Sequence, residues 1–204
     1  MVYRPTEKTR ARKLAQRELL LAAARSLVAQ GGFASASIQA VAREAGVATG
    51  TVYRYFPSKA DLFVEVFVEA SSREVEMMAR ASEGHASASE ALSAAIQTWA
   101  SRALEGRTLA YALIAEPVMP EVEAARLRLR RAYVDLLRQT LVRGCERGEF
   151  SLPNVDVAAA AIVGALGEAL VGPLSPGDTS LSRDALISDL THFCLQAVTP
   201  SRPS

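Results

Sequence analysis

The sequence predicts an all-α protein, and three observations support that prediction. Ala and Leu are abundant among the 204 residues, strand-like runs of β-branched residues are nearly absent, and apolar residues recur at helical spacing from end to end. Half of the residues are hydrophobic, so the chain can bury a sizeable core. We expect about nine helices in two domains, one over residues 1–72 and one over residues 73–204.

The first three helices are expected to form one group. The first runs from about Thr9 to Gly31, where two glycines stop it and Phe33 can fold back as the hydrophobic contact of a C-cap. The second covers about Ile38 to Glu44 and has Ser37 as its N-cap. The third covers about Ala48 to Tyr55 and ends before a proline, which disfavours helical geometry in the residue that precedes it.

Longer helices follow in the second domain. Ser58 and Asp61 have the spacing of a capping box, with Asp in place of Glu, at the start of a fourth helix that reaches about Arg80. Residues 82–89, rich in Ser, Ala and Gly, form a linker. The five remaining helices are expected at about Glu90 to Leu104, Thr108 to Ala115, Glu121 to Arg147, Val155 to Val171 and Leu181 to Ala197.

The second and third helices are separated by only a few residues, which include a glycine. This is a helix-turn-helix arrangement, whose second helix can enter the major groove of DNA. On a helical wheel Val52 points inward, and the polar side chains of the third helix point away from the core. The residues expected to meet double-stranded DNA are Ser37, Thr49, Gly50, Thr51, Tyr53, Arg54 and Lys59, together with Arg12 and Lys13 at the basic N-terminal end.

These residue types suit contact with DNA. Arg54 can reach the O6 and N7 atoms of guanine or a phosphate. Thr49 and Thr51 can bond to phosphate or contact a thymine methyl group. Gly50 has no side chain, so the backbone can approach the groove closely. Lys59 lies in the first turn of the fourth helix, where the helix dipole also favours a phosphate.

The charge is unevenly distributed. Residues 1–61 hold ten Lys and Arg against four Asp and Glu, whereas residues 62–204 hold 13 against 18. The asymmetry favours a polyanionic partner for the N-terminal end. A solvated basic tail gives the same balance, and helix-turn-helix geometry also occurs in ordinary helical packing. A helical ligand-binding or protein-interaction module, with a basic face for a protein or membrane surface, is therefore the alternative.

The stretch "SIQAVAREAGVATGTVYRYFPSKADLF", preceded by "LLLAAARSLVAQGGF", resembles the N-terminal domain of the TetR family of bacterial transcriptional regulators. The similarity spans about residues 14–70. It implies a homodimeric repressor that binds a pseudo-palindromic operator and is released by a small-molecule ligand of the C-terminal domain. Ala48 stands where the family often has a capping Ser, so either Thr49 takes that role or no side chain does. Tyr55 stands where His is frequent.

The segment "RTLAYALIAEPVMPEVEAARLRLRRAYVDLLRQTLVRGCERGEF" is more loosely similar to one C-terminal variant of this family. A ligand pocket between the fifth and eighth helices is expected to use Trp99, Arg102, Tyr111, Glu116, Met119, Tyr133 and Glu168. Each of these residues also fits a plain core or surface role. The resemblance further implies a dimer interface on the last two helices, for which the candidates are Ile162, Leu166, Leu186, Leu190 and Phe193; packing within one chain is the alternative.

No grouping of residues indicates an enzyme, a metal or another cofactor. His192 and Cys194 are two positions apart, which places them about 200° apart on a helix, so they cannot share a metal ion. The two cysteines form no disulfide framework, which fits a reducing cytoplasm. No uninterrupted apolar run reaches the roughly 18 residues of a membrane span. The basic N-terminus lacks the apolar segment of a signal peptide. We therefore expect a cytoplasmic protein without a membrane partner.

Overall fold

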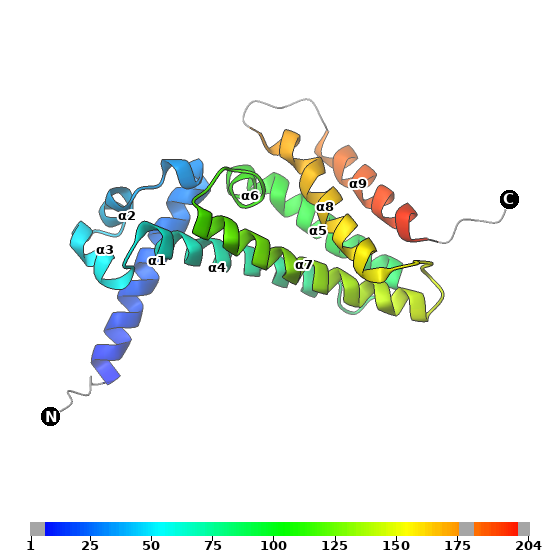
Figure 1. The fold of residues 1–204 in the computed structure, drawn as a ribbon, viewed down its shortest axis with the longest axis horizontal. Helices are drawn as coiled ribbons and strands as arrows, with labels where there is room; N and C mark the ends of the chain where they lie inside the picture. Colours follow the sequence, from blue (N-terminus) through cyan, green and yellow to red (C-terminus); the bar gives the residue numbers. More distant parts are fainter. Residues whose placement is uncertain (1–6, 176–181, 200–204) are drawn as a thin grey trace.

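The computed structural model describes residues 7–175 and 182–199, and within these ranges the chain forms nine α-helices and no strand (Figure 1). The all-α prediction is confirmed. The helices are α1 (Glu7–Ser35), α2 (Ile38–Glu44), α3 (Thr49–Tyr55), α4 (Lys59–Ala81), α5 (Ala88–Glu105), α6 (Arg107–Ile114), α7 (Pro120–Glu146), α8 (Val155–Leu174) and α9 (Arg183–Val198).

The helix α1 is interrupted by a kink close to its end. Gly31 and Gly32 leave helical geometry, and Gly32 has a φ of 74°, a left-handed conformation that favours glycine. The kink returns Phe33 to the core, where its ring lies edge-on to the ring of Phe63 at 5.7 Å. The two glycines end the regular helix where the sequence predicted, and the residues after the kink add a last short turn to α1.

The turn between α2 and α3 follows the predicted pattern. Gly46 has a φ of 65°, and the backbone N–H of Val47 donates to the carbonyl oxygen of Ala42 at 2.9 Å. The Ser37 hydroxyl accepts from the backbone N–H of Ala40 at 3.1 Å and so caps α2, as expected. No side chain caps α3, because Ala48 occupies the N-cap position and Thr49 does not replace it.

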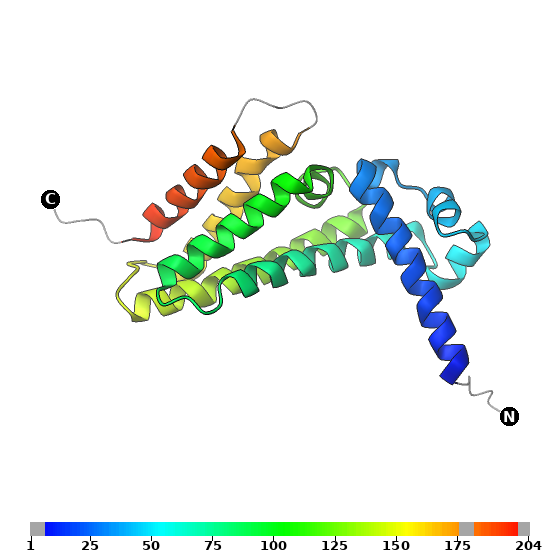
Figure 2. The ribbon, with the colours of Figure 1, turned by 180° about the vertical axis from the view of Figure 1, so that it is seen from behind.

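The helix α4 joins the two parts of the molecule. Its N-terminus is fixed by the predicted capping box, in which Ser58 and Asp61 each accept a hydrogen bond from the backbone of the other. The helix continues beside α7 and α5, and Figure 2 shows α4 and α7 side by side over most of their length. The first turn of α4 therefore lies next to the end of α3, and its later turns lie in the C-terminal part.

A second hydrophobic core holds the C-terminal helices together. Leu92 and Ile96 of α5, Leu137 and Leu141 of α7, and Leu166 of α8 are almost fully buried in it. The helix α8 continues past the expected end at residue 171, because the proline at position 173 lies in the last turn and removes only one helical hydrogen bond. The expected start of the last helix at Leu181 lies outside the described residues, and α9 is described from Arg183.

The apolar helix α8 is only partly covered. By length and composition it is the one described helix that could cross a membrane, although Asp156 and Glu168 interrupt its apolar sequence. In the structure α8 packs against α5, α6, α7 and α9, so it is part of the C-terminal bundle. Its opposite face, which includes Val157 at 63% exposure, has no neighbour in the described chain.

Candidate DNA-binding surface and ligand cavity

The helix α3 presents one face to the solvent. Val52 is fully buried beneath it, whereas Gly50, Tyr53 and Arg54 are exposed, and Tyr53 is 47% accessible. Thr49 and Thr51 lie half-buried at the start of the same helix. The side chains expected to read base edges are thus displayed on a surface that is anchored by Val52.

Two cations at the border of α3 rest on aromatic rings. The Arg54 guanidinium lies 5.5 Å from the ring centre of Tyr55, and the Lys59 ammonium lies 5.3 Å from that of Phe63. Such contacts hold a cation near a ring without neutralising its charge. Ser37 accepts its capping bond and keeps its own O–H for a further acceptor. These three side chains can therefore still bond to DNA phosphates or bases.

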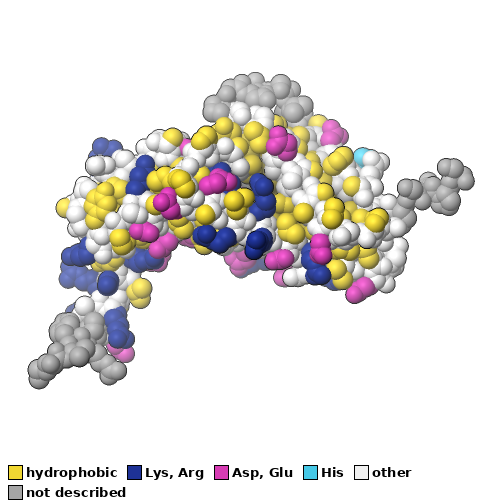
Figure 3. Space-filling model, in the orientation of Figure 1, with side chains coloured by type: hydrophobic (Ala, Val, Ile, Leu, Met, Phe, Trp, Pro, Cys, Tyr) yellow, Lys and Arg dark blue, Asp and Glu magenta, His cyan; other side chains and the backbone are white. Residues whose placement is uncertain are grey.

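The N-terminal turns of α1 project beyond the rest of the molecule. Arg12 and Lys13 are exposed there, and Figure 3 shows Lys and Arg side chains gathered on this projection. Arg17, one turn further on, behaves differently. It pairs with Glu65 of α4 and lies 5.0 Å from the ring centre of Phe56, so it fixes α1 to α4.

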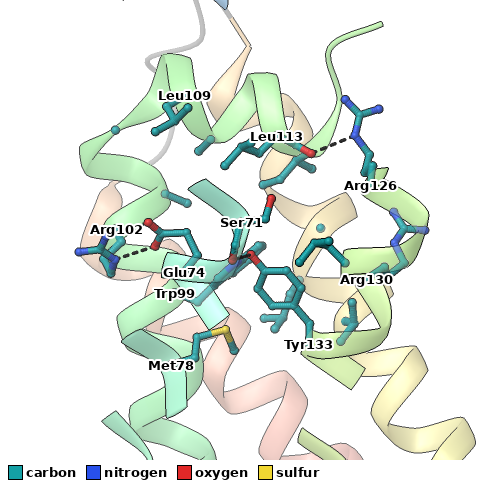
Figure 4. Close-up of a pocket in the computed structure, with 18 of the residues that line it drawn as sticks. Ser71, Glu74, Met78, Trp99, Arg102, Leu109, Leu113, Arg126, Arg130 and Tyr133 are labelled. Atoms are coloured by element: carbon teal, nitrogen blue, oxygen red, sulfur yellow. Dashed lines mark hydrogen bonds and ion pairs between the residues drawn. The ribbon is translucent and has the colours of Figure 1, made fainter. Parts of the chain in front are cut away.

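A cavity of about 440 Å³ lies in the C-terminal part, between α4, α5, α6, α7 and α8. Its volume is in the range of small-molecule binding sites, and most of the side chains around it are apolar. Three of the predicted pocket residues line it, namely Trp99, Arg102 and Tyr133 (Figure 4).

The polar groups of the cavity are few and mostly paired. Arg102 donates two hydrogen bonds to Glu74, at 2.6 and 2.7 Å, and these bonds raise the pKa of Arg102. The hydroxyl of Tyr133 donates to the carbonyl oxygen of Ser71 at 3.2 Å, and burial raises the pKa of this tyrosine. The Tyr133 hydroxyl and the Arg102 guanidinium therefore keep their protons and act as hydrogen-bond donors in the wall of the cavity.

The α7 side of the cavity carries two arginines. Arg126 is half-buried and donates to backbone carbonyls at the end of α6, and burial lowers its pKa. Arg130, one turn further along α7, is exposed and is drawn at the edge of the cavity in Figure 4. The α4–α5 side instead holds the carboxylates of Glu74 and Glu105. The cavity is therefore more positive on its α7 side.

Four of the predicted pocket residues do not line the cavity, because each packs, bonds or points elsewhere. Tyr111 packs on the cluster around Leu170, and Met119 packs against the N-terminal core. Glu168 is exposed on the outer face of α8. Glu116 is buried, but its carboxylate binds the backbone of α1. Sequence spacing placed these residues near the right helices but not on the faces that line the cavity.

Sequence reasoning did not identify several residues that line the cavity. The clearest group comes from α4, where the apolar and polar side chains follow one another at helical spacing. This spacing could have identified them, because it marks one continuous face of α4. The missed α4 residues are Phe67, Ser71, Glu74 and Met78.

The expected dimer residues fall on two different faces. Ile162, Leu166 and Leu190 are buried within the chain's own core, at 4%, 2% and 6% exposure, so a partner cannot reach them. Phe193 is 60% exposed, and Leu186 is partly buried. The exposed stripe of α8 is formed by Val157, Ala161, Gly164 and Glu168, and that of α9 by Asp189, Phe193 and Ala197.

Two family models match the chain. The model of bacterial regulatory proteins, tetR family, matches residues 20–66, and the model of the Tetracyclin repressor-like, C-terminal domain matches residues 85–170. The first therefore covers the helix-turn-helix, and the second covers most of the helices around the cavity.

Individual proteins are also similar. The Fatty acid metabolism regulator protein of Bacillus subtilis (strain 168) is 28% identical over 148 residues, which are 69% of this chain and 73% of that protein. The HTH-type transcriptional repressor KstR of Rhodococcus jostii is 44% identical over 61 residues, which are 30% of this chain and only 27% of the repressor.

Solved structures share the fold. The transcriptional regulator FadR from Bacillus subtilis, in complex with stearoyl-CoA, superposes with a TM-score of 0.75 at 24% identity and covers 87% of this chain and 97% of its own. At this identity the likeness concerns the fold alone. Together, the two family models and the exposed helix-turn-helix face show that the chain belongs to the TetR family of bacterial regulatory proteins and is a DNA-binding transcriptional regulator, not an enzyme.

Proposed function

We propose that this regulator is a cytoplasmic homodimeric repressor that binds a pseudo-palindromic operator and leaves it when a small molecule fills the cavity. The observation that carries the proposal is the course of α4. The first turn of α4 follows α3 directly, and Phe67, Ser71 and Met78 further along the same helix line the cavity. A ligand that displaces this wall also displaces the start of α4 and, with it, α3.

In this proposal α3 reads the operator in the major groove. Arg54 and the two threonines of α3 contact base edges. Gly50 has no side chain, so the backbone of α3 can come close to the wall of the groove. Ser37, Lys59 and the projecting Arg12 and Lys13 bind phosphates and supply affinity that depends little on sequence.

The second copy is proposed to cover the exposed stripes of α8 and α9. Small residues such as Ala161 and Gly164 allow two helices to approach closely, and an added Cβ at Gly164 would meet no atom of its own chain within 4 Å. On the neighbouring helix α9, Phe193 supplies an exposed aromatic side chain. A two-fold interface of this kind places two copies of α3 on two half-sites.

For the effector we propose a long apolar chain that carries an anionic end, and long-chain acyl-CoA thioesters are the first class to test. The apolar lining of the cavity accommodates the chain, and Arg130 on the α7 side accommodates the anion. Two similar proteins support this choice, because one is named a fatty acid metabolism regulator and the crystal structure of the other is a complex with stearoyl-CoA.

The experiment begins with selection of genomic DNA fragments by the purified protein, followed by anisotropy titrations on the recovered duplex. We expect salt-dependent binding to a site with two-fold symmetry and a loss of affinity when stearoyl-CoA is added. Trp99, the single tryptophan, lines the cavity and reports its occupation by fluorescence. Recovery of no preferred duplex at low ionic strength would refute the operator proposal. A bound operator that is insensitive to stearoyl-CoA, with unchanged Trp99 emission, would refute the effector class alone.

A further inference from the structure

A buried carboxylate connects the two parts of the chain. Glu116 lies in the loop between α6 and α7 and is 8% exposed. Its two carboxylate oxygens accept hydrogen bonds from the backbone N–H groups of Phe33, at 2.9 Å, and Ala34, at 2.7 Å. Both groups lie directly after the kink of α1, where the interrupted helix leaves N–H groups without helical acceptors.

The backbone of α1 is shaped to receive this carboxylate. Gly32 has a left-handed φ of 74°, and a Cβ built at this position would lie 2.5 Å from one oxygen of Glu116. Any side chain here would therefore collide with the carboxylate as well as strain the backbone. The approach of Glu116 to Phe33 and Ala34 thus depends on a glycine.

The other side of Glu116 is tied to the wall of the cavity. Its backbone carbonyl oxygen accepts a hydrogen bond from Nη2 of Arg126 at 2.8 Å. Arg126 lines the cavity and also donates to the carbonyl oxygens of Ala112 and Leu113 at the end of α6, and Figure 4 marks the bond to Leu113. A continuous series of hydrogen bonds therefore leads from the cavity through Arg126 and Glu116 to α1.

Apolar contacts follow the same route. Leu109 and Leu113 of α6 line the cavity and also pack against the hydrophobic core of the N-terminal helices. A ligand that moves α6 thus moves the loop that carries Glu116. Arg126 also pairs with the carboxylate of Glu123, so its carbonyl bonds are the neutral part of its contacts. An anionic ligand group near Arg126 would compete with these carbonyls, because hydrogen bonds to a charged acceptor are stronger.

We propose that Glu116 is the residue that transmits occupation of the cavity to α1, by a route separate from α4. This inference rests on the ligand-driven release proposed above and specifies how it reaches the DNA-binding helices. When α6 and its following loop shift, the carboxylate shifts the backbone at Phe33 and Ala34, and the adjoining glycines let the segment turn. The helices α2 and α3 follow directly in the chain, so their position on the operator changes.

The test uses the full-length protein with Glu116→Gln. Glutamine keeps the size of the side chain but offers one acceptor oxygen, and its NH₂ group opposes the second backbone N–H. Stearoyl-CoA binding is followed by Trp99 fluorescence and operator binding by anisotropy. We expect each single affinity to stay within about threefold of wild type, while the loss of operator affinity caused by stearoyl-CoA falls from about tenfold or more to about twofold. The ratio to compare is the operator affinity without stearoyl-CoA divided by the affinity with it, and a wild-type value of this ratio in Glu116→Gln overturns the inference.

A matched control separates coupling from loss of charge. Glu121→Gln makes the same chemical change at an exposed residue in the first turn of α7, and we expect it to keep the wild-type ratio. Should Glu116→Gln fail to fold, Glu116→Asp keeps the charge but is too short to serve both N–H groups. We expect it to weaken the coupling, and wild-type coupling in this variant counts against the inference.

A ligand-independent arm distinguishes failure of this inference from failure of the proposed effector. Leu113→Trp fills the cavity from α6 without any added molecule, so it applies even when stearoyl-CoA has no effect on wild type. We expect Leu113→Trp to lower operator affinity, and the double variant with Glu116→Gln to regain it within about threefold. An equal loss in both backgrounds shows that Glu116 transmits nothing, whatever the natural effector is.

Discussion

Two arginines of α1 illustrate how one residue type serves different purposes. Arg12 is exposed on the projecting turns, whereas Arg17 pairs with Glu65 and lies against the ring of Phe56. The sequence alone does not distinguish the two arginines, because the partner of Arg17 lies 48 residues away in the chain. At the scale of single residues, function is therefore decided by long-range partners that periodicity does not reveal.

The contact roles of Arg54 and Lys59 can be separated by substitution. Arg54→Ala should relax the preference for operator over random duplex by about tenfold, because a base-edge contact carries the discrimination. Lys59→Ala should weaken binding to both duplexes similarly. It should also lower the slope of the logarithm of the binding constant against the logarithm of the salt concentration by about one. Anisotropy titrations over a range of salt concentrations measure both effects. Arg80→Ala, at the far end of α4, is the control, and an Arg54→Ala protein with intact preference contradicts the assignment.

The orientation of the effector can be tested at Arg130. Removing this exposed guanidinium should weaken stearoyl-CoA binding by about fivefold, in line with an exposed ion pair, and leave the neutral 1-octadecanol unaffected. Trp99 fluorescence titrations give both affinities. Arg131→Ala removes a neighbouring exposed charge that does not line the cavity and should change neither. Equal losses for the charged and the neutral probe would mean that Arg130 does not select the anion.

At the scale of elements, much of the fold was predictable because local chemistry determines it. The capping residues Ser37 and Ser58 and the turn at Gly46 were identified from the sequence, and the structure has α2 over the expected residues. The cavity was less predictable. Trp99, Arg102 and Tyr133 line it, but Glu116 does not, because its acceptors are satisfied by a backbone segment more than 80 residues away.

The outer faces of α8 and α9 could not be predicted from the spacing of apolar residues either. In a helix rich in Ala and Gly, apolar residues occur on all sides, so the spacing cannot distinguish the buried face from an exposed one. The resemblance to the family placed Leu166 and Leu190 at the dimer interface, with packing within one chain as the alternative, and they belong to the core. The exposed stripe is instead marked by its small residues and by Phe193.

The capping box of α4 makes a quantitative prediction. Ser58→Ala removes the acceptor of the Asp61 backbone N–H and should lower the free energy of unfolding by about 1 kcal/mol. Ser72→Ala, at an exposed interior position of the same helix, should leave it unchanged or slightly raised, because Ala has the higher helix propensity. Urea unfolding followed by circular dichroism compares them at equal protein concentration. Equal stability of the two variants would mean that the cap contributes nothing.

At the scale of the whole molecule, the proposed dimer holds two copies of α3 at a fixed distance. The helix α3 has only seven residues, so in this proposal one protomer reads few base pairs and binds weakly by itself. The basic end of the chain supplies affinity for any duplex, and the proposed interface on α8 and α9 converts this into selectivity for two half-sites. The interface is also the part of the proposal that can be removed without altering either the DNA-binding surface or the cavity.

A substitution at Gly164 should disrupt the proposed interface. A Cβ at Gly164 points into open space, with no atom within 4 Å outside the backbone of its own helix, and Gly164→Glu replaces a glycine within a helix, so the protomer should remain folded. Across a two-fold axis the new carboxylates face each other and the nearby Glu168, and like charges in a desolvated contact are unfavourable. Sedimentation should show a monomer at concentrations where wild type is a dimer, and operator affinity should fall by about a hundredfold or more, because each protomer then binds one half-site.

Ser72→Glu, which adds the same charge to the exposed side of α4, should keep the dimer mass and the operator affinity. A Gly164→Glu protein that still sediments as a dimer would place the interface on another face of the molecule, and the two-fold arrangement of the recognition helices would have to be rebuilt from that face.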